Sequence, residues 1–306
     1  MGSPVRPLVV WRFSDGKTGH DNQSRGLTEG LARLRPVEIV TPQLLPATAA
    51  LLALASSAPT AWRTLPAPDL LVGAGHGTHL SLLAARRARG GRAVVLMSPS
   101  LPLGLFDLCL IPEHDAPPAR ANVLTTRGAL NRLQPSSNLE PRQGLLLIGG
   151  PSAHFGWNDA DLRAQIAAIL AADSSMRWTL TTSRRTPASF LSACHDPADD
   201  RLTVVPVAAS GPDWLPAQLA RAGQIWVSAD SVSMVYEALT AGAAVGVLDV
   251  PRKRSSRISR GLDKLTGEGW ITPFADWQRH PRLKRPPQTF NEAERCARWI
   301  AARWFA

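Results

Sequence analysis

The segment SDGKTGHDNQ, residues 14–23, joins a short apolar run to a helical pattern and carries several groups that can do chemistry. His20 has an imidazole that titrates near neutral pH and Asp15 has a carboxylate, so either side chain can take a proton from a hydroxyl group. Residues that turn the backbone or contact an anion fill the rest of the loop: Gly16, Lys17, Gly19, Asn22 and Gln23. We predict a helix that begins near Asn22 and points its free N–H groups at the loop. The alternative is an ordinary strand-to-helix turn capped by Asp21 or Asn22.

A second glycine-rich loop, VGAGHGTH at residues 72–79, resembles the dinucleotide-binding pattern G-x-G-x-x-G without matching it. The sixth position of the pattern is Thr78, and no acidic residue ends the following apolar run AVVLM. Both departures argue against a nicotinamide cofactor, whose ribose is bound by that acidic residue. Gly75 and His76 either contact a phosphate or an acceptor molecule, or the glycines only let a helix pack closely on the sheet.

Two loops in the second half of the chain combine glycine, hydroxyl and arginine residues. They are IGGPS at residues 148–152 and TTSRRTP at residues 181–187. Arg184 and Arg185 offer planar guanidinium groups that match the oxygens of a diphosphate. The other candidate donor-binding residues of these loops are Gly149, Gly150, Ser152 and Ser183. The alternative is a solvated arginine pair at the start of a helix.

The segment VSADSVSMVYEALTAGAAVGVLDVP, residues 227–251, predicts a strand, a helix and a second strand. The helix begins after Asp230 with Ser231 or Ser233 near its first turn, so its unpaired amides are available to a phosphate. Glu237 falls in the second turn, where a carboxylate can accept hydrogen bonds from ribose or sugar hydroxyls. A structural interpretation instead makes Ser231 a helix cap and Glu237 a surface residue.

Short apolar runs alternate with helical patterns along the chain, which predicts an α/β fold with parallel sheets. A polar, proline-bearing segment at residues 127–142 interrupts the alternation and predicts a linker between two lobes. We therefore predict Rossmann-like lobes at 1–135 and 143–285, and a helix at 286–306 that packs back across the lobes. The two parallel sheets are expected to face a central cleft, with ligands at the carboxyl ends of the strands.

The net charge of +10 comes from arginine, since only four of the 34 basic residues are lysine. An arginine excess favours acidic partners such as phosphorylated small molecules or an anionic membrane face. The basic run RKRSSRISR at residues 252–260 can touch such a surface, although a solvated helix face is the commoner case. The ten tryptophans are spread along the chain without forming a stacking platform, so we predict no nucleic-acid partner.

Other patterns narrow the class of protein. The apolar stretch at residues 44–59 is broken by proline and serine and is shorter than the roughly 18 to 20 residues of a membrane span. The seven histidines lack metal-ligand spacing, so we predict no metal site. Cys109, Cys194 and Cys296 are far apart in apolar surroundings and predict reduced thiols. We expect a cytoplasmic protein that can associate peripherally with the inner face of the membrane.

The loops above also carry a family resemblance, together with SPSLPLGLFDLCLIPEHD, VLTTRGALNRL and LLIGGPSAHFGW. From Val10 to Phe274 the chain resembles the family named after the plant mitochondrial fission protein Elm, whose bacterial members are labelled glycosyltransferases or nucleoside-diphosphate-sugar epimerases. Its layout is also similar to glycosyltransferases of the GT-B architecture. The resemblance implies a metal-independent transferase that uses a nucleoside-diphosphate sugar as substrate, needs no cofactor, and acts on a cell-envelope glycan or a lipid-linked acceptor. The alternative is a non-catalytic adaptor that recruits a partner at a membrane surface.

The GT-B resemblance also implies roles for the two lobes and for the first loop. The second lobe is expected to bind the nucleotide sugar and the first lobe the acceptor. The chain is similar to the lipid-linked N-acetylglucosaminyltransferase of peptidoglycan synthesis, whose first loop carries a histidine suspected as base, which implies that role for His20 or Asp15. Short-chain epimerases use a tyrosine followed four residues later by a lysine. The single tyrosine of this chain, Tyr236, is followed there by Thr240, and the dinucleotide-binding pattern is also missing, so we reject the epimerase label.

Overall fold

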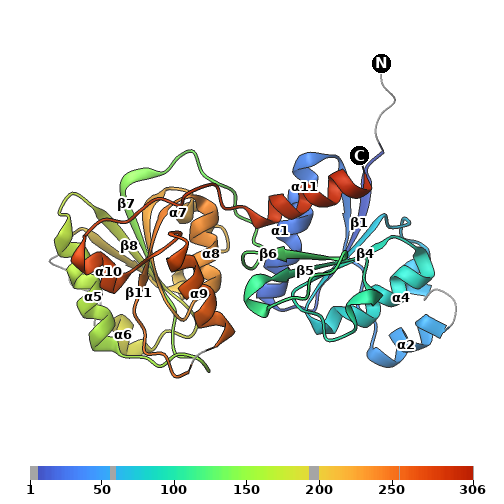
Figure 1. Ribbon diagram of the computed structural model, residues 1–306, viewed down its shortest axis with the longest axis horizontal. Helices are drawn as coiled ribbons and strands as arrows, with labels where there is room; N and C mark the ends of the chain where they lie inside the picture. Colours follow the sequence, from blue (N-terminus) through green and yellow to red (C-terminus); the bar gives the residue numbers. More distant parts are fainter. Residues whose placement is uncertain (1–5, 56–59, 193–199, 255, 306) are drawn as a thin grey trace, which may run out of the picture. The chain divides into compact units, whose positions relative to one another are not determined.

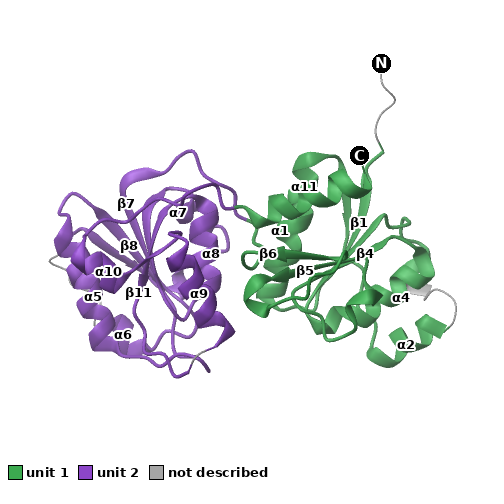
Figure 2. Cartoon of the chain, in the orientation of Figure 1, with its two compact units in different colours: residues 1–132, 291–306 green, residues 133–290 purple. Residues whose placement is uncertain are grey.

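The computed structural model describes residues 6–55, 60–192, 200–254 and 256–305. The chain divides into two compact units (Figures 1 and 2): unit 1 comprises residues 1–132 and 291–306, and unit 2 comprises residues 133–290. The chain leaves unit 1 after Arg132, within the segment that the sequence marks as a linker, and returns at Asn291. Cys194 lies outside the described residues.

Unit 1 contains a six-stranded parallel sheet. Its strands are β1 (Leu8–Phe13), β2 (Val37–Val40), β3 (Leu70–Ala74), β4 (Arg92–Leu96), β5 (Leu108–Pro112) and β6 (Val123–Thr126). Their order across the sheet is β2-β1-β3-β4-β5-β6, and every neighbouring pair is parallel. All six residues of β1 are buried, as in a strand that is covered on both faces. Apolar runs in the sequence predict the first five strands, whereas β6 ends in two threonines and was not predicted.

Helices cover both faces of this sheet (Figure 1). They are α1 (Thr18–Leu34), α2 (Ala47–Ala55), α3 (Thr60–Arg63), α4 (His79–Arg89) and α11 (Glu292–Trp304). Alternate residues of β1 point to opposite faces, so Val10 joins a core with α1 and α11, while Trp11 joins a core with α3 and α4. The sequence predicted a helix at 286–306 that packs across the lobes, whereas the structure starts α11 at Glu292 and packs it on α1 of unit 1.

Unit 2 repeats this architecture. Its strands are β7 (Glu140–Ile148), β8 (Arg177–Thr182), β9 (Leu202–Val205), β10 (Ala222–Ser228), β11 (Ala244–Leu248) and β12 (Thr272–Pro273). They are parallel throughout, in the order β12-β11-β10-β7-β8-β9. The helices are α5 (Asp159–Ala172), α6 (Ala188–Ser192), α7 (Trp214–Leu219), α8 (Val232–Ala241), α9 (Arg257–Gly267) and α10 (Phe274–Arg279). The predicted fold class, α/β with two Rossmann-like parallel sheets, is confirmed.

Candidate functional site

Each sheet has one point where its strand order reverses direction. In unit 1 the chain places β2 on one side of β1 and β3 on the other. In unit 2 it places β8 on one side of β7 and β10 on the other. The loops that follow such a pair of strands diverge, and open α/β sheets bind their ligands in the crevice between them. Of the five loops that the sequence marks as polar or glycine-rich, four follow β1, β3, β7 and β10, the strands that flank these two points, and the fifth follows β8.

In unit 1 the loop after β1 holds a hydrogen-bonded carboxylate and imidazole. Nδ1 of His20 lies 2.9 Å from Oδ2 and 3.1 Å from Oδ1 of Asp15. Their side chains are 18% and 9% exposed, so solvent screens the pair only partly. A carboxylate at this distance favours the tautomer with the proton on Nδ1, which leaves the lone pair of Nε2 available as a proton acceptor.

The loop after β3 lies directly against this pair. Gly75 has a left-handed φ of 80°, and a Cβ added to it would fall 2.3 Å from Cε1 and Nδ1 of His20. A Cβ on Gly77 would come within 3.3 Å of the Cβ of Asp15. Only glycine at position 75 therefore leaves room for the imidazole. The structure thus brings two predicted loops into one cluster, in which Gly75 contacts His20 from a position 55 residues later in the chain. The neighbouring His76 is exposed.

Helix α1 begins earlier than the sequence predicted. It starts at Thr18 and not near Asn22, so neither Asp21 nor Asn22 caps it; Lys17 holds the capping position without a side-chain hydrogen bond. Gln23 is buried on the first turns of this helix. The earlier start leaves the amides of the first turn next to the loop that holds Asp15, with no capping side chain.

Asp21 has a different role, which the sequence did not indicate. It accepts a hydrogen bond of 2.8 Å from the guanidinium of Arg12, a buried arginine on β1. Burial by itself would raise the pKa of Asp21, but hydrogen bonds from Ser14 and Arg12 and the charge of Arg12 outweigh it and lower that pKa. The ion pair fixes α1 on β1 and therefore fixes the position of the loop between them.

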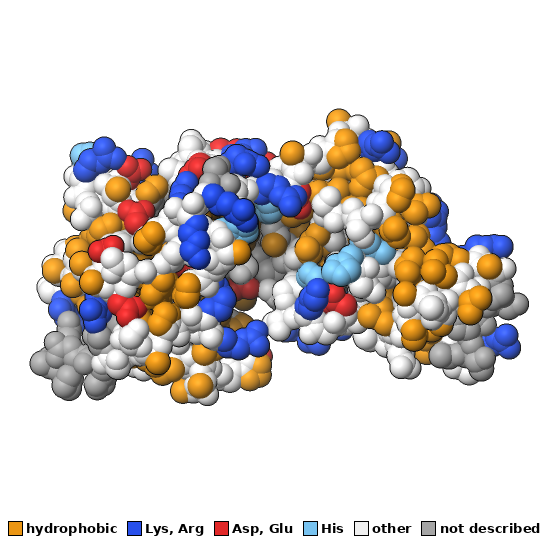
Figure 3. Space-filling view, turned by 90° about the horizontal axis from the view of Figure 1, so that it is seen from below, with side chains coloured by type: hydrophobic (Ala, Val, Ile, Leu, Met, Phe, Trp, Pro, Cys, Tyr) orange, Lys and Arg blue, Asp and Glu red, His pale blue; other side chains and the backbone are white. Residues whose placement is uncertain are grey.

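A further histidine near this site, His79, is buried at the start of α4. Its Nδ1 lies 3.4 Å from the hydroxyl of Ser100, and its Nε2 has no hydrogen-bond partner within the described part of the chain. Burial, and to a lesser extent the nearby His76, lowers the pKa of His79, so this imidazole is neutral at physiological pH. The surface of unit 1 in Figure 3 shows histidine side chains grouped beside a basic and an acidic side chain.

In unit 2 the centre of the site is the carboxylate of Asp230, whose side chain is fully buried. Its Oδ2 accepts hydrogen bonds from the amide of Gly150 (2.9 Å), the guanidinium of Arg185 (2.8 Å) and the hydroxyl of Ser231 (3.0 Å). Arg185 also donates to the carbonyl of Gly150 at 2.6 Å. The loops after β7, β8 and β10 are therefore joined through one ion pair.

The two glycines after β7 allow these loops to approach. A Cβ on Gly149 would fall 2.1 Å from Oδ2 of Asp230, and a Cβ on Gly150 would fall 2.2 Å from the carbonyl oxygen of Arg185. The amide of Gly149 donates to the hydroxyl of Ser228 at 2.7 Å, a contact that the sequence did not indicate. Any side chain at either glycine would push the loops apart.

Helix α8 starts beside this cluster without a side-chain cap. Ser231 occupies the capping position, but its hydroxyl bonds to Asp230 and Arg185 and not to an amide of the first turn. The structural interpretation of Ser231 as a cap is therefore wrong. The amides of Val232 and Ser233 have no intrahelical acceptor, and Ser233 is exposed. The start of α8 can donate hydrogen bonds to an anion.

The remaining predicted donor residues are less closely connected to this centre. Ser183 accepts a hydrogen bond from the amide of Arg185, whereas Ser152 accepts from the amides of His154 and Phe155 within its own turn. Arg184 is exposed, and within the described residues no carboxylate pairs with it. Glu237 is half-buried in the second turn of α8. Among the residues that the structure describes, no three histidine, cysteine or acidic side chains gather as metal ligands.

Two successive Rossmann-like units with glycine-rich loops at their switch points define the GT-B class of fold. A Listeria monocytogenes protein assigned as a UDP-N-acetylglucosamine 2-epimerase is similar to this chain at 9% identity with a TM-score of 0.63, over 97% of this chain and 96% of that chain. The glycotransferase of kitacinnamycin is similar at 12% identity with a TM-score of 0.57, over 98% of this chain and 100% of that chain. S. aureus MnaA with UDP is similar at 12% identity with a TM-score of 0.51, over 96% of this chain and 87% of that chain. At these identities the likeness shows the fold alone.

Residues 18–304 match the family described as mitochondrial fission ELM1, and the chain belongs to this family. A comparison with curated proteins finds no match. In the described residues, no helix has the length and apolar character that crossing a bilayer requires.

Proposed function

We propose that the protein is a glycosyltransferase that binds a nucleoside-diphosphate sugar on unit 2 and an acceptor hydroxyl on unit 1. The observation that carries the proposal is the uncapped start of α8 beside the pair of Asp230 and Arg185. Helix starts of this kind bind phosphate groups, and here the helix lies at the switch point of its sheet.

The charges around α8 suit a diphosphate. Arg185 neutralises Asp230, so the buried carboxylate does not repel an anion that approaches the helix. Arg184 adds a second guanidinium on the same loop, and its charge is not matched by an acid in the described part of the chain. Fixed amides and one unmatched cation can stabilise the negative charge that develops on a departing diphosphate. This chemistry requires no metal ion.

The pair of Asp15 and His20 supplies the proton chemistry of the proposal. His20 takes the proton of the acceptor hydroxyl on Nε2 while Asp15 holds its Nδ1–H and stabilises the imidazolium that forms. The hydroxyl oxygen forms a bond to the anomeric carbon as the bond from that carbon to the diphosphate breaks. Glu237 is proposed to hold a ribose or sugar hydroxyl, and the acceptor is proposed to be a cell-envelope glycan or a lipid-linked sugar.

The first experiment is a thermal-shift screen and calorimetry with a panel of nucleoside-diphosphate sugars. We expect at least one member to raise the melting temperature and bind, since a ligand of the folded state stabilises it. Arg184→Ala and Glu237→Ala are each expected to weaken that binding at least about tenfold. Arg260→Ala, which removes an exposed arginine of α9, is the control and should bind normally. Unchanged affinity in both site variants would refute the placement of the donor.

A second candidate is a UDP-sugar epimerase, because the structure assigned as a UDP-N-acetylglucosamine 2-epimerase is similar to this chain with a TM-score of 0.63. The argument from Tyr236 concerns short-chain epimerases and does not address this fold. An epimerase would convert a nucleotide sugar without an acceptor, which proton NMR of the sugar detects. The third candidate, a non-catalytic adaptor, rests on membership of the fission family and predicts no thermal shift with any nucleotide sugar.

A further inference from the structure

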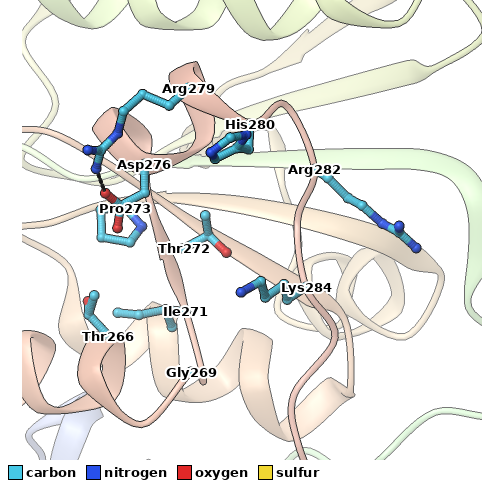
Figure 4. Close-up of a pocket in the computed structure, with 10 residues that line it drawn as sticks. All are labelled: Thr266, Gly269, Ile271, Thr272, Pro273, Asp276, Arg279, His280, Arg282 and Lys284. Carbon is cyan, nitrogen blue, oxygen red and sulfur yellow. Dashed lines mark hydrogen bonds and ion pairs between the residues drawn. The ribbon is translucent and has the colours of Figure 1, made fainter.

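A separate pocket of unit 2, here called the basic pocket, lies along the edge strand β12. Its volume is about 420 Å³, and it is formed by the end of α9, by β12, by α10 and by residues 280–284 (Figure 4). None of its lining residues belongs to the candidate donor site at β7 and β10. The volume falls within the range of small-molecule sites, which is roughly 300 to 1,000 Å³.

The basic pocket carries an excess of positive charge. Its single acidic residue, Asp276, is already paired with Arg279 three residues further along α10. Arg282 and Lys284 also line the pocket, and in the described part of the chain no carboxylate lies within ion-pair distance of either. Two positive charges therefore remain unmatched at this cavity.

The charged side chains of the basic pocket point in different directions. In Figure 4 the ammonium group of Lys284 points toward the hydroxyl of Thr272, Arg279 turns back to Asp276, and the guanidinium of Arg282 points away from Thr272. Leu283 is half-buried and lines an adjacent pocket together with Trp277 and Arg282. Arg282 and Lys284 are themselves exposed, so an anion can reach both from solvent.

We propose that the basic pocket binds a phosphate group. A phosphate monoester carries about 1.5 to 2 negative charges near neutral pH, which matches the two unmatched cations better than a single carboxylate does. The ammonium of Lys284 and the hydroxyl of Thr272 are the donors that face each other in this pocket, and the exposed guanidinium of Arg282 adds a second positive charge at its rim. The phosphate belongs either to a free small molecule or to a lipid headgroup, since both present the same chemistry.

The test is calorimetry of the full chain with glycerol 3-phosphate and with inorganic phosphate at low ionic strength. We expect Lys284→Ala to weaken binding about tenfold and Lys284→Ala with Arg282→Ala to abolish it. The matched control is Arg285→Ala, which removes the exposed neighbouring cation outside the pocket and should change the affinity less than twofold. Binding that survives the double variant, or that Arg285→Ala weakens as much as Lys284→Ala, would overturn the proposal.

Two further arms separate the pocket from other sources of binding. The Arg185→Ala variant should bind phosphate with the affinity of the native protein, because it leaves the basic pocket intact. If this variant no longer binds phosphate, the signal belongs to the donor site and the proposal is overturned. Co-sedimentation with phosphatidylglycerol vesicles, compared with phosphatidylcholine vesicles, tests the lipid source. Sedimentation that Lys284→Ala prevents identifies a headgroup site, and binding of glycerol 3-phosphate without sedimentation identifies a free phosphate ester.

Discussion

The contact between Gly75 and His20 can be tested with two glycine variants. Gly75 and Gly16 both have left-handed backbone angles, with φ of 80° and 76°. A Cβ on Gly75 would fall 2.3 Å from the His20 ring, whereas a Cβ on Gly16 would meet nothing within 4 Å. Gly16→Ala therefore measures the strain of a positive φ alone, whereas Gly75→Ala combines displacement of the imidazole with a backbone conformation, φ 80° and ψ 156°, that is nearly restricted to glycine.

The two variants are expected to lose different amounts of stability. A left-handed alanine costs about 1 to 2 kcal/mol, which is the expected loss in the free energy of unfolding for Gly16→Ala. In Gly75→Ala the imidazole must also leave its hydrogen bond to Asp15, and a hydrogen bond to a charged group contributes about 1.5 to 3 kcal/mol. We therefore expect Gly75→Ala to be less stable than Gly16→Ala by at least that second amount, since the backbone conformation of Gly75 also disfavours alanine.

Urea denaturation measures the two free energies, and NMR of the imidazole resonances follows His20 directly. We expect the His20 signals to move in Gly75→Ala and to stay in place in Gly16→Ala. If His20 is the base, the transferase activity of Gly75→Ala should fall by roughly 10² to 10⁴, while Gly16→Ala keeps most of it. Equal losses of stability together with unmoved His20 signals would show that the imidazole does not occupy the space above Gly75.

Three further predictions follow from buried groups. Asp230→Asn should lower the free energy of unfolding by about 1 to 3 kcal/mol, because its carboxylate is buried and accepts three hydrogen bonds. The control is Asp263→Asn in an exposed ion pair, which should change the free energy of unfolding in urea titrations by less than about 0.5 kcal/mol. Burial raises the pKa of the Cys109 thiol to about 11 and that of Cys296 to about 12, so neither should react with iodoacetamide at pH 8 until the protein unfolds, as residue-level mass spectrometry can check. The lowered pKa of Asp21 stabilises the fold above its unfolded pKa of about 3.9, and this contribution is lost as pH falls through the lower folded value. The difference in stability between the native protein and Asp21→Asn should therefore shrink on acidification, and a constant difference would contradict this assignment.

The sequence predicted the sheets and the loops of the site because both depend on local patterns. Buried parallel strands such as β1 and β10 read as continuous apolar runs, and the chain places its glycines and polar residues where these runs end. Strand β6 was missed because two of its four residues are threonines and it does not form an apolar run, and β12 was missed because it has only two residues. The start of α1 was misplaced because Lys17 is not a capping residue, so the sequence carries no signal there.

The pairings within the site could not be predicted from local patterns. The contact of Gly75 with His20 joins positions 55 residues apart, and the ion pair of Arg185 with Asp230 joins positions 45 residues apart. The sequence predicted Arg185 as a cation that binds a ligand, whereas in the structure its guanidinium forms an ion pair with Asp230. Arg12 gave no signal, because a single arginine inside an apolar strand does not reveal its partner.

The helix starts of the protein separate into two groups with different physical consequences. Helices α5, α9 and α11 begin with side-chain caps, from Asn158, Ser256 and Asn291. Such a cap contributes about 0.5 to 2 kcal/mol, yet α1 and α8, the helices that follow β1 and β10 at the switch points, begin without one. Helix α4, which follows β3, also begins without a side-chain cap, so α1, α4 and α8 all start uncapped after strands that flank a switch point.

Beside each of the helix starts of α1 and α8 lies a carboxylate that is bound by a basic side chain, and the two bases differ in one property. Asp15 is paired with an imidazole, and Asp230 is paired with a guanidinium. A histidine can accept and release a proton near neutral pH, whereas an arginine stays protonated. In the proposed function, proton transfer is therefore assigned to His20 of unit 1, and Asp230 with Arg185 of unit 2 to the side that binds the diphosphate. This division of labour is what a transfer reaction with an anionic leaving group requires.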